Sequence, residues 1–207
     1  MLKRTLGRSL LALLVITGLA GTIKDNSISK KERKHGLGIL KDTRDDATQA
    51  CKGLSEAQLN FKAAPDKWSV KECMYHIAGA EKLLWGLFEA TMKSPANPEK
   101  RSEIKVTDEQ IVKMIEDRSV KAQAPEPIQP RNTGFNSLDD ALEDFKKNRG
   151  DHIKYLRTST EDLRNHVMQM PFGYIDGYQF LLFMAAHSNR HTQQINEVKA
   201  AAGFPAK

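Results

Sequence analysis

The sequence lacks the short motifs that mark several large enzyme classes. Its 207 residues contain no glycine-rich phosphate-binding loop and no Gly-x-Ser-x-Gly nucleophile motif. They also contain no internal repeat, no low-complexity tract and no convincing β-strand pattern. These absences disfavour a nucleotide-binding α/β enzyme and a serine hydrolase of the α/β type.

Cysteine is scarce, with only Cys51 and Cys73 in the chain. The two lie on consecutive expected helices, so a disulfide between them stays open, although two small buried apolar residues are the simpler interpretation. Cys73 also precedes His76 by three residues, which makes it a weak candidate for a fourth metal ligand.

Long hydrophobic runs are limited to residues 10–20, about half of the roughly 20 residues that span a bilayer. Lys3, Arg4 and Arg8 precede this run, and the small residues Gly18, Ala20 and Gly21 lie at its end. This pattern predicts a signal peptide over 1–23, or alternatively an N-terminal anchor that contacts the membrane. We therefore expect a periplasmic, secreted or anchored protein, with a cytoplasmic protein as the alternative, and a linker over 24–31.

A strong excess of positive charge is also missing once this segment is set aside. The net charge is +6, and three of the positive charges lie on Lys3, Arg4 and Arg8. The remaining domain gives no reason to expect nucleic acid as a partner. A small-molecule substrate is the expected partner, and a homodimer is left open.

What the chain does contain is four amphipathic helical patterns, over about 32–54, 69–92, 137–159 and from 176 onward, ending at Gly203. Residues 93–136 hold several prolines and one short helical pattern over about 107–120. The expected fold is all-α, a four-helix bundle over 32–203. The long crossover connection between helices two and three, carrying the short extra helix, lets those two helices run parallel. Residues 166–179 are expected to form a loop.

Three histidines lie on the apolar faces of these helices. His187 and His191 are four residues apart, so they share one face of helix four, and His76 lies on the apolar face of helix two. An unpaired polar group is costly on such a face, and imidazole nitrogens are good ligands for zinc. The pattern predicts a site with three protein ligands and one open coordination position, as in catalytic zinc sites.

Apart from the three histidines, no residue lies at a spacing that requires a catalytic role. Glu81, five residues after His76, and Gln194, three after His191, are the candidates, and Glu197 lies further along. His152 lies on the apolar face of helix three and is either a site-lining residue or a hydrogen-bonded core residue.

Two sequence blocks resemble the DinB-like family of four-helix bundles. The first is Trp68-Ser69 followed by His76 and Glu81, and the second is FGYIDGYQFLLFMAAHSNRHTQQI, which contains Arg190, His191 and Gln194. The resemblance covers residues from about 32 to 200.

This resemblance implies a divalent metal, with zinc expected and nickel as the alternative, held by His76, His187 and His191. Members of the family include thiol-dependent transferases. The resulting hypothesis is a metal-dependent enzyme, either a hydrolase or a thiol S-transferase. The alternative is a non-catalytic module that binds a metal or a small ligand.

Overall fold

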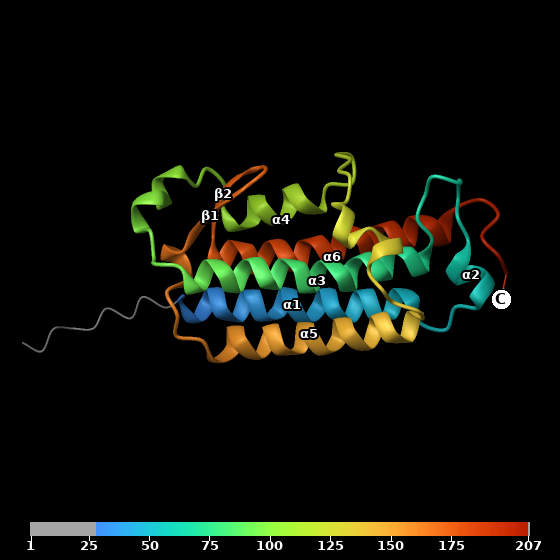
Figure 1. Ribbon diagram of the computed structural model, residues 1–207, viewed down its shortest axis with the longest axis horizontal. Coiled ribbons are helices and arrows are strands. Elements are labelled where there is room, and N and C mark those ends of the chain that lie inside the picture. Colours follow the sequence, from blue (N-terminus) through green and yellow to red (C-terminus); the bar gives the residue numbers. More distant parts are fainter. Residues whose placement is uncertain (1–27, 207) are drawn as a thin grey trace, which may run out of the picture.

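The computed structural model describes residues 28–206, so the expected signal peptide or anchor over 1–23 lies outside the described residues. Four long helices run side by side, as Figure 1 shows. They are α1 (Lys30–Cys51), α3 (Val70–Lys93), α5 (Leu138–Thr158) and α6 (Gly177–Ala200). The predicted all-α four-helix bundle is confirmed.

Side-chain capping boxes determine where these helices begin. Ser69 and Glu72 form one at the start of α3, and Asp176 and Gln179 form another at α6. Each pair satisfies two backbone N–H groups that have no partner within the helix. Ser29 and Glu32 cap α1 in the same way, which starts this helix two residues earlier than the sequence pattern indicated.

The connectivity places helices that are distant in sequence next to one another. α1 packs between α5 and α6, and α3 packs against the same two helices from the other side. α3 and α5 run in the same direction, and so do α1 and α6 (Figure 1). The predicted parallel arrangement of the second and third long helices is therefore present.

The crossover between α3 and α5 makes this arrangement possible. It contains η1 (Pro98–Glu103), α4 (Asp108–Glu116), η2 (Glu126–Ile128) and η3 (Pro130–Asn132). α4 packs on α6. This helix is shorter than the expected 107–120, because Arg190 of α6 bonds the carbonyls of Ile115, Asp117 and Val120 where the chain turns away.

The segment before α6 differs from the sequence expectation, which was a loop without strands. Residues Val167–Met170 (β1) and Gly173–Asp176 (β2) form an antiparallel hairpin after the short η4 (Leu163–Asn165). Pro171 and Gly173 look like loop residues in the sequence. In the structure, Pro171 is one of two turn residues, and Gly173 adopts a φ of 126° as β2 begins.

The first connection also differs from the expectation. α1 ends at Cys51 rather than near Leu54, because Gly53 turns the chain with a φ of 70°. Residues 55–68 carry no amphipathic helical pattern, but Ser55 and Gln58 form a capping box that starts the short α2 (Glu56–Asn60).

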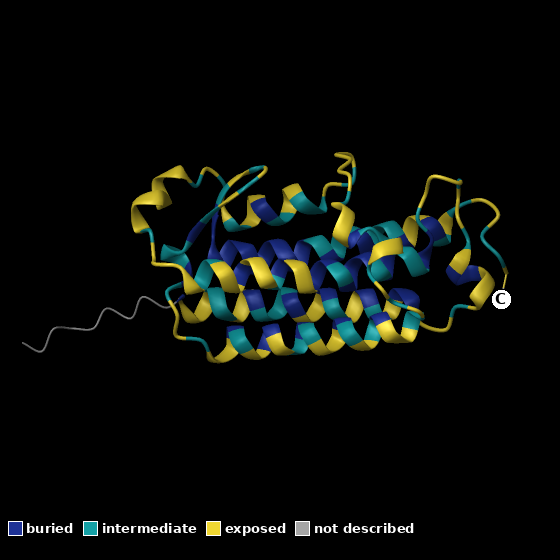
Figure 2. Cartoon of the chain, in the orientation of Figure 1, coloured by how far each residue is buried: buried dark blue, intermediate teal, exposed yellow. Residues whose placement is uncertain are grey.

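The core consists of two apolar clusters with a polar layer between them along the bundle. One cluster includes Leu40, Leu156 and Met184, and the other includes Ala47, Phe145 and Ile195. α6 is buried along most of its length (Figure 2). Within residues 28–206, none of the helices combines the length and the apolar character that a membrane-spanning helix requires.

Candidate metal centre

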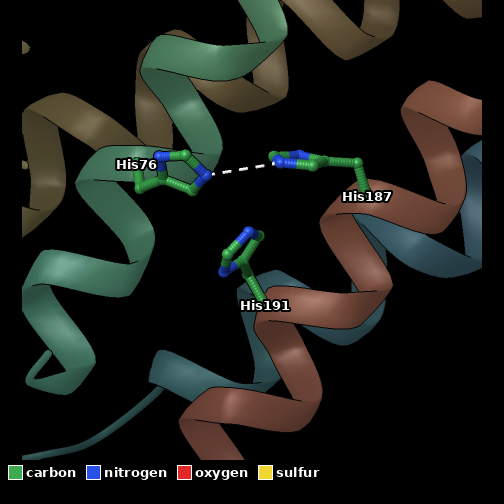
Figure 3. Close-up of side chains that lie close together, drawn as sticks. All are labelled: His76, His187 and His191. Atoms are coloured by element: carbon green, nitrogen blue, oxygen red, sulfur yellow. Dashed lines mark hydrogen bonds between the residues drawn. The ribbon is translucent and has the colours of Figure 1, made fainter. Parts of the chain in front are cut away.

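The bundle brings the three predicted histidines together. His76 projects from α3, while His187 and His191 project from successive turns of α6 toward it (Figure 3). One ring nitrogen from each histidine lies within 4.8 Å of the other two. Within the described part of the chain, this is the group of His, Cys, Asp and Glu side chains arranged to hold a metal ion.

Hydrogen bonds to the far ring nitrogens orient two of the imidazoles. His76 Nδ1 lies 2.7 Å from the carbonyl oxygen of Ile128, and His191 Nδ1 lies 3.0 Å from Gln194 Oε1. Both oxygens can only accept, so each Nδ1 donates and each Nε2 keeps its lone pair. Outer hydrogen bonds of this kind select the tautomer and the ring orientation of metal-ligating histidines.

The remaining nitrogens approach one another closely. His76 Nε2 lies 3.3 Å from His187 Nε2, and the ring centroids of His76 and His191 are 4.3 Å apart. Because His76 Nε2 keeps its lone pair, this contact is a hydrogen bond in which His187 Nε2 donates. A cation bound to all three rings would take the place of that hydrogen.

Burial keeps these imidazoles uncharged. Desolvation lowers the pKa of His76, and the hydrogen bond to Ile128 opposes that effect only in part. Desolvation, strengthened by the neighbouring His76, lowers the pKa of His187 to about 3. The pKa of His191 is also well below its usual value because of burial and the other two histidines. Neutral imidazole is the form that binds a metal ion, so the triad is ready to ligate at neutral pH.

An aromatic side chain closes one side of the triad. Trp68 stacks against His191 with ring centroids 5.8 Å apart and packs at 4.8 Å against His76. Trp68 directly precedes the Ser69 cap of α3, so the same turn that starts the helix also supplies this wall. Phe183 packs one turn before His187 on α6, at 6.2 Å.

The donor set fits a divalent metal with an open position. Three neutral imidazoles from two rigid helices match the ligand number of catalytic zinc sites, which leave the fourth position to water or substrate. Cys73 is not part of the group. Cys73 and Cys51 are free thiols buried in the apolar cluster around Phe145, and burial raises the pKa of Cys51 to about 12.

The structure places the other candidates differently. Gln194 contacts the triad through His191, whereas Glu81 forms a two-point ion pair with Arg149, at 2.6 and 2.7 Å. His152 lies beside Glu81, with Nδ1 2.7 Å from the carboxylate, rather than in the triad. Glu197 pairs with Arg118 at the surface.

The sequence interpretation missed Arg149. Its guanidinium is fully buried in the polar layer between the two apolar clusters. The signal was available, because Phe145, Arg149, His152 and Leu156 recur at spacings of four, three and four on one helix face. An arginine on an apolar stripe requires a buried partner. The carbonyl of Ile128 was not predictable, because it reaches His76 from the crossover.

Comparison with known proteins agrees with this arrangement. The family model of the DinB superfamily matches residues 39–195. This chain belongs to the DinB superfamily. It is 23% identical over 164 residues to the uncharacterized protein YuaE of Bacillus subtilis (strain 168), a match that covers 79% of this chain and 96% of YuaE.

A solved structure shows the same fold. YfiT from Bacillus subtilis superposes with a TM-score of 0.60 and 18% sequence identity, over 86% of this chain and 92% of that one. YfiT is described as a probable metal-dependent hydrolase with an unusual four-helix bundle topology. The likeness confirms the four-helix bundle fold of the DinB-superfamily chain.

Proposed function

We propose that this DinB-superfamily protein is a metal-dependent hydrolase with a divalent ion at His76, His187 and His191. Zinc is the ion we propose first, and nickel is the alternative. The observation that carries the proposal is the convergence of three neutral imidazoles, of which His76 and His191 are buried and are held in the ligating tautomer by Ile128 and Gln194. The description of YfiT as a probable metal-dependent hydrolase supports the same class.

A divalent ion held by three imidazoles supplies a Lewis acid and lowers the pKa of a coordinated water to about 7. The residues of this chain contribute the rest. Gln194 and the Ile128 carbonyl hold the ligand rings, and Trp68 shields one side of the triad from solvent. His187 is the most accessible of the three ligands, so we propose that substrate approaches from its side.

Thiol transfer is the second candidate, and the position of Glu81 favours it over reactions that need a carboxylate base. Glu81 is held by Arg149 and His152, and no described carboxylate belongs to the triad. A metal that ionises a bound thiol directly does not require such a base. We propose hydrolysis first because the N-terminal sequence suggests export, and low-molecular-weight thiols are scarcer in oxidising compartments.

Metal analysis of the protein purified without chelators tests the proposal. We expect about one divalent ion per chain, and loss of that ion in His187→Ala. His35→Ala, which changes an exposed histidine of α1, is the matched control and should keep the ion. A metal content far below one ion per chain, with no uptake of added zinc or nickel, would exclude the proposed site.

Catalysis is tested separately from binding. The zinc-loaded protein is assayed for hydrolysis of ester, amide and phosphoester panels, and for transfer of low-molecular-weight thiols. Activity that disappears in His76→Ala, while helical circular dichroism is retained, supports the enzyme. Full metal binding without turnover in any assay would instead favour a non-catalytic binding module. Loss of helical structure in His76→Ala would favour a structural metal.

A further inference from the structure

One buried arginine links its own helix to the other three long helices of the bundle. Arg149 of α5 donates to Glu81 of α3 through Nε and Nη2, and to Thr43 Oγ1 of α1 through Nη1 at 2.8 Å. Nη2 also donates to Ser188 Oγ of α6 at 2.6 Å. Longer bonds to the carbonyls of Leu40 (3.3 Å) and Met184 (3.4 Å) complete the set.

Stability alone does not account for such a cluster. Removing an arginine and a carboxylate from water is expensive, and apolar replacements of buried ion pairs are often neutral or stabilising. Directional hydrogen bonds do fix the position of one helix along another. Apolar side chains tolerate small shifts along a helix axis, whereas a two-point ion pair does not. The cluster is therefore suited to fixing how the helices sit against one another.

The contacts of Arg149 on α3 and α6 lie close to the metal ligands. Ser188 directly follows His187, and Met184 precedes it by three residues. Glu81 follows His76 by five residues on α3. The 3.3 Å separation of His76 Nε2 and His187 Nε2 depends on the position of these two helices relative to each other.

We propose that Arg149 is a positioning residue for the metal centre, holding α3 and α6 in the register that brings His76 to His187 and His191. The inference rests on the proposed metal site. Arg149 does not touch the triad and acts through Glu81 and Ser188. Thr43 anchors the same guanidinium to α1, which carries no ligand, so this bond should matter for stability but not for metal binding.

Two single substitutions separate these roles. Ser188→Ala removes the link to the ligand-bearing α6, and Thr43→Val removes the link to α1. Each deletes one hydroxyl that accepts from Arg149 at a similar distance and that also donates to a carbonyl of its own helix. Both proteins are compared with the wild type by zinc titration against a chromophoric chelator, by the visible spectrum of bound Co²⁺, and by urea unfolding without metal.

We expect both substitutions to lower the free energy of unfolding to a similar extent. Only Ser188→Ala should weaken zinc binding and alter the Co²⁺ spectrum. The double variant Glu81→Gln/Arg149→Met removes both charges and leaves an amide oxygen to accept from His152. We expect its zinc affinity to fall by about 10- to 100-fold, the range seen when groups that orient metal ligands are removed.

The outcomes distinguish a failure of the proposed metal site from a failure of the positioning role of Arg149. If the wild type fails to bind zinc or nickel, the proposed metal site itself is wrong. If the wild type binds but the double variant binds equally tightly with an unchanged Co²⁺ spectrum, Arg149 is not a positioning residue. Equal effects of Ser188→Ala and Thr43→Val on affinity would also overturn the inference, because they would show general loosening of the bundle. Should the double variant not fold, the two single variants still decide.

Discussion

Gln194 Oε1 accepts a hydrogen bond from His191 Nδ1 at 3.0 Å, one turn further along α6. This bond leaves His191 Nε2 free for a metal ion and fixes the plane of the ring. We expect Gln194→Ala to weaken zinc binding about 10- to 100-fold, as measured by chelator competition. Gln193→Ala is the matched control, since Gln193 bonds the carbonyl of Glu116 instead. Equal losses in both variants would contradict a specific role of Gln194.

Trp68 should report metal binding directly. Its ring packs against His76 and His191, whereas Trp85, the other tryptophan, stacks on His152 at 3.9 Å. An open-shell ion such as Co²⁺ or Ni²⁺ at the triad should quench the fluorescence of Trp68 in proportion to occupancy. Trp68→Phe should abolish the metal-dependent quenching and Trp85→Phe should preserve it. Quenching that survives in Trp68→Phe would place the ion elsewhere.

The buried carboxylate of Glu81 should make the stability of the folded protein sensitive to acid. Burial alone would raise the pKa of this carboxyl, but the charge and hydrogen bonds of Arg149 and the bond from His152 outweigh that effect and hold the pKa at about 2, against 4.5 when unfolded. A lowered folded-state pKa contributes stability above pH 4.5, and this contribution is lost as the pH falls toward 2. The group adds a slope of at most about 1.4 kcal/mol per pH unit within this window.

Urea unfolding of the metal-free protein between pH 6 and pH 3.5 measures this slope. Glu81→Gln/Arg149→Met should show a shallower dependence below pH 4.5 than the wild type. Glu32, whose pKa is also about 2, contributes equally to both proteins, and the opposing effects of Glu81 and Arg149 on the pKa of His187 are removed together in the double variant. Parallel curves for the two proteins would show that Glu81 is not held ionised in the folded state.

Gly79 allows the crossover to lie close to α3 near His76. A Cβ at this position would lie 2.8 Å from Thr133 Cγ2, and Thr133 is held by its bond to the Pro130 carbonyl. Gly79→Ala should cost about 1–3 kcal/mol from overpacking, more than the roughly 1 kcal/mol that alanine adds to helix propensity. Thr133→Ser removes the methyl group and keeps the hydroxyl, so the double variant should recover the loss. A Gly79→Ala protein more stable than the wild type in urea unfolding would contradict this packing.

Local signals in the sequence were enough to predict the four long helices. They also predicted that two of the three proposed ligands lie side by side on one helix. The capping residues Ser69 and Asp176 and the recurrence of apolar residues every three or four positions depend only on helix geometry. The spacing of His187 and His191 places them on one face for the same reason. The hairpin before α6 was missed, because strand pairing over four residues carries a weak pattern and Pro171 obscured it.

By itself the sequence determined where the four long helices lie, which of their faces are apolar, and that three histidines occupy such faces, because helix periodicity and capping are local. Only the tertiary structure decided which helices are neighbours. Packing of α3 against α6 brings His76 to His187, and the crossover delivers the Ile128 carbonyl to its ring. Arg149 engages Glu81, which removes that carboxylate from the metal centre. These contacts join residues 52 to 111 positions apart, and no local spacing encodes them.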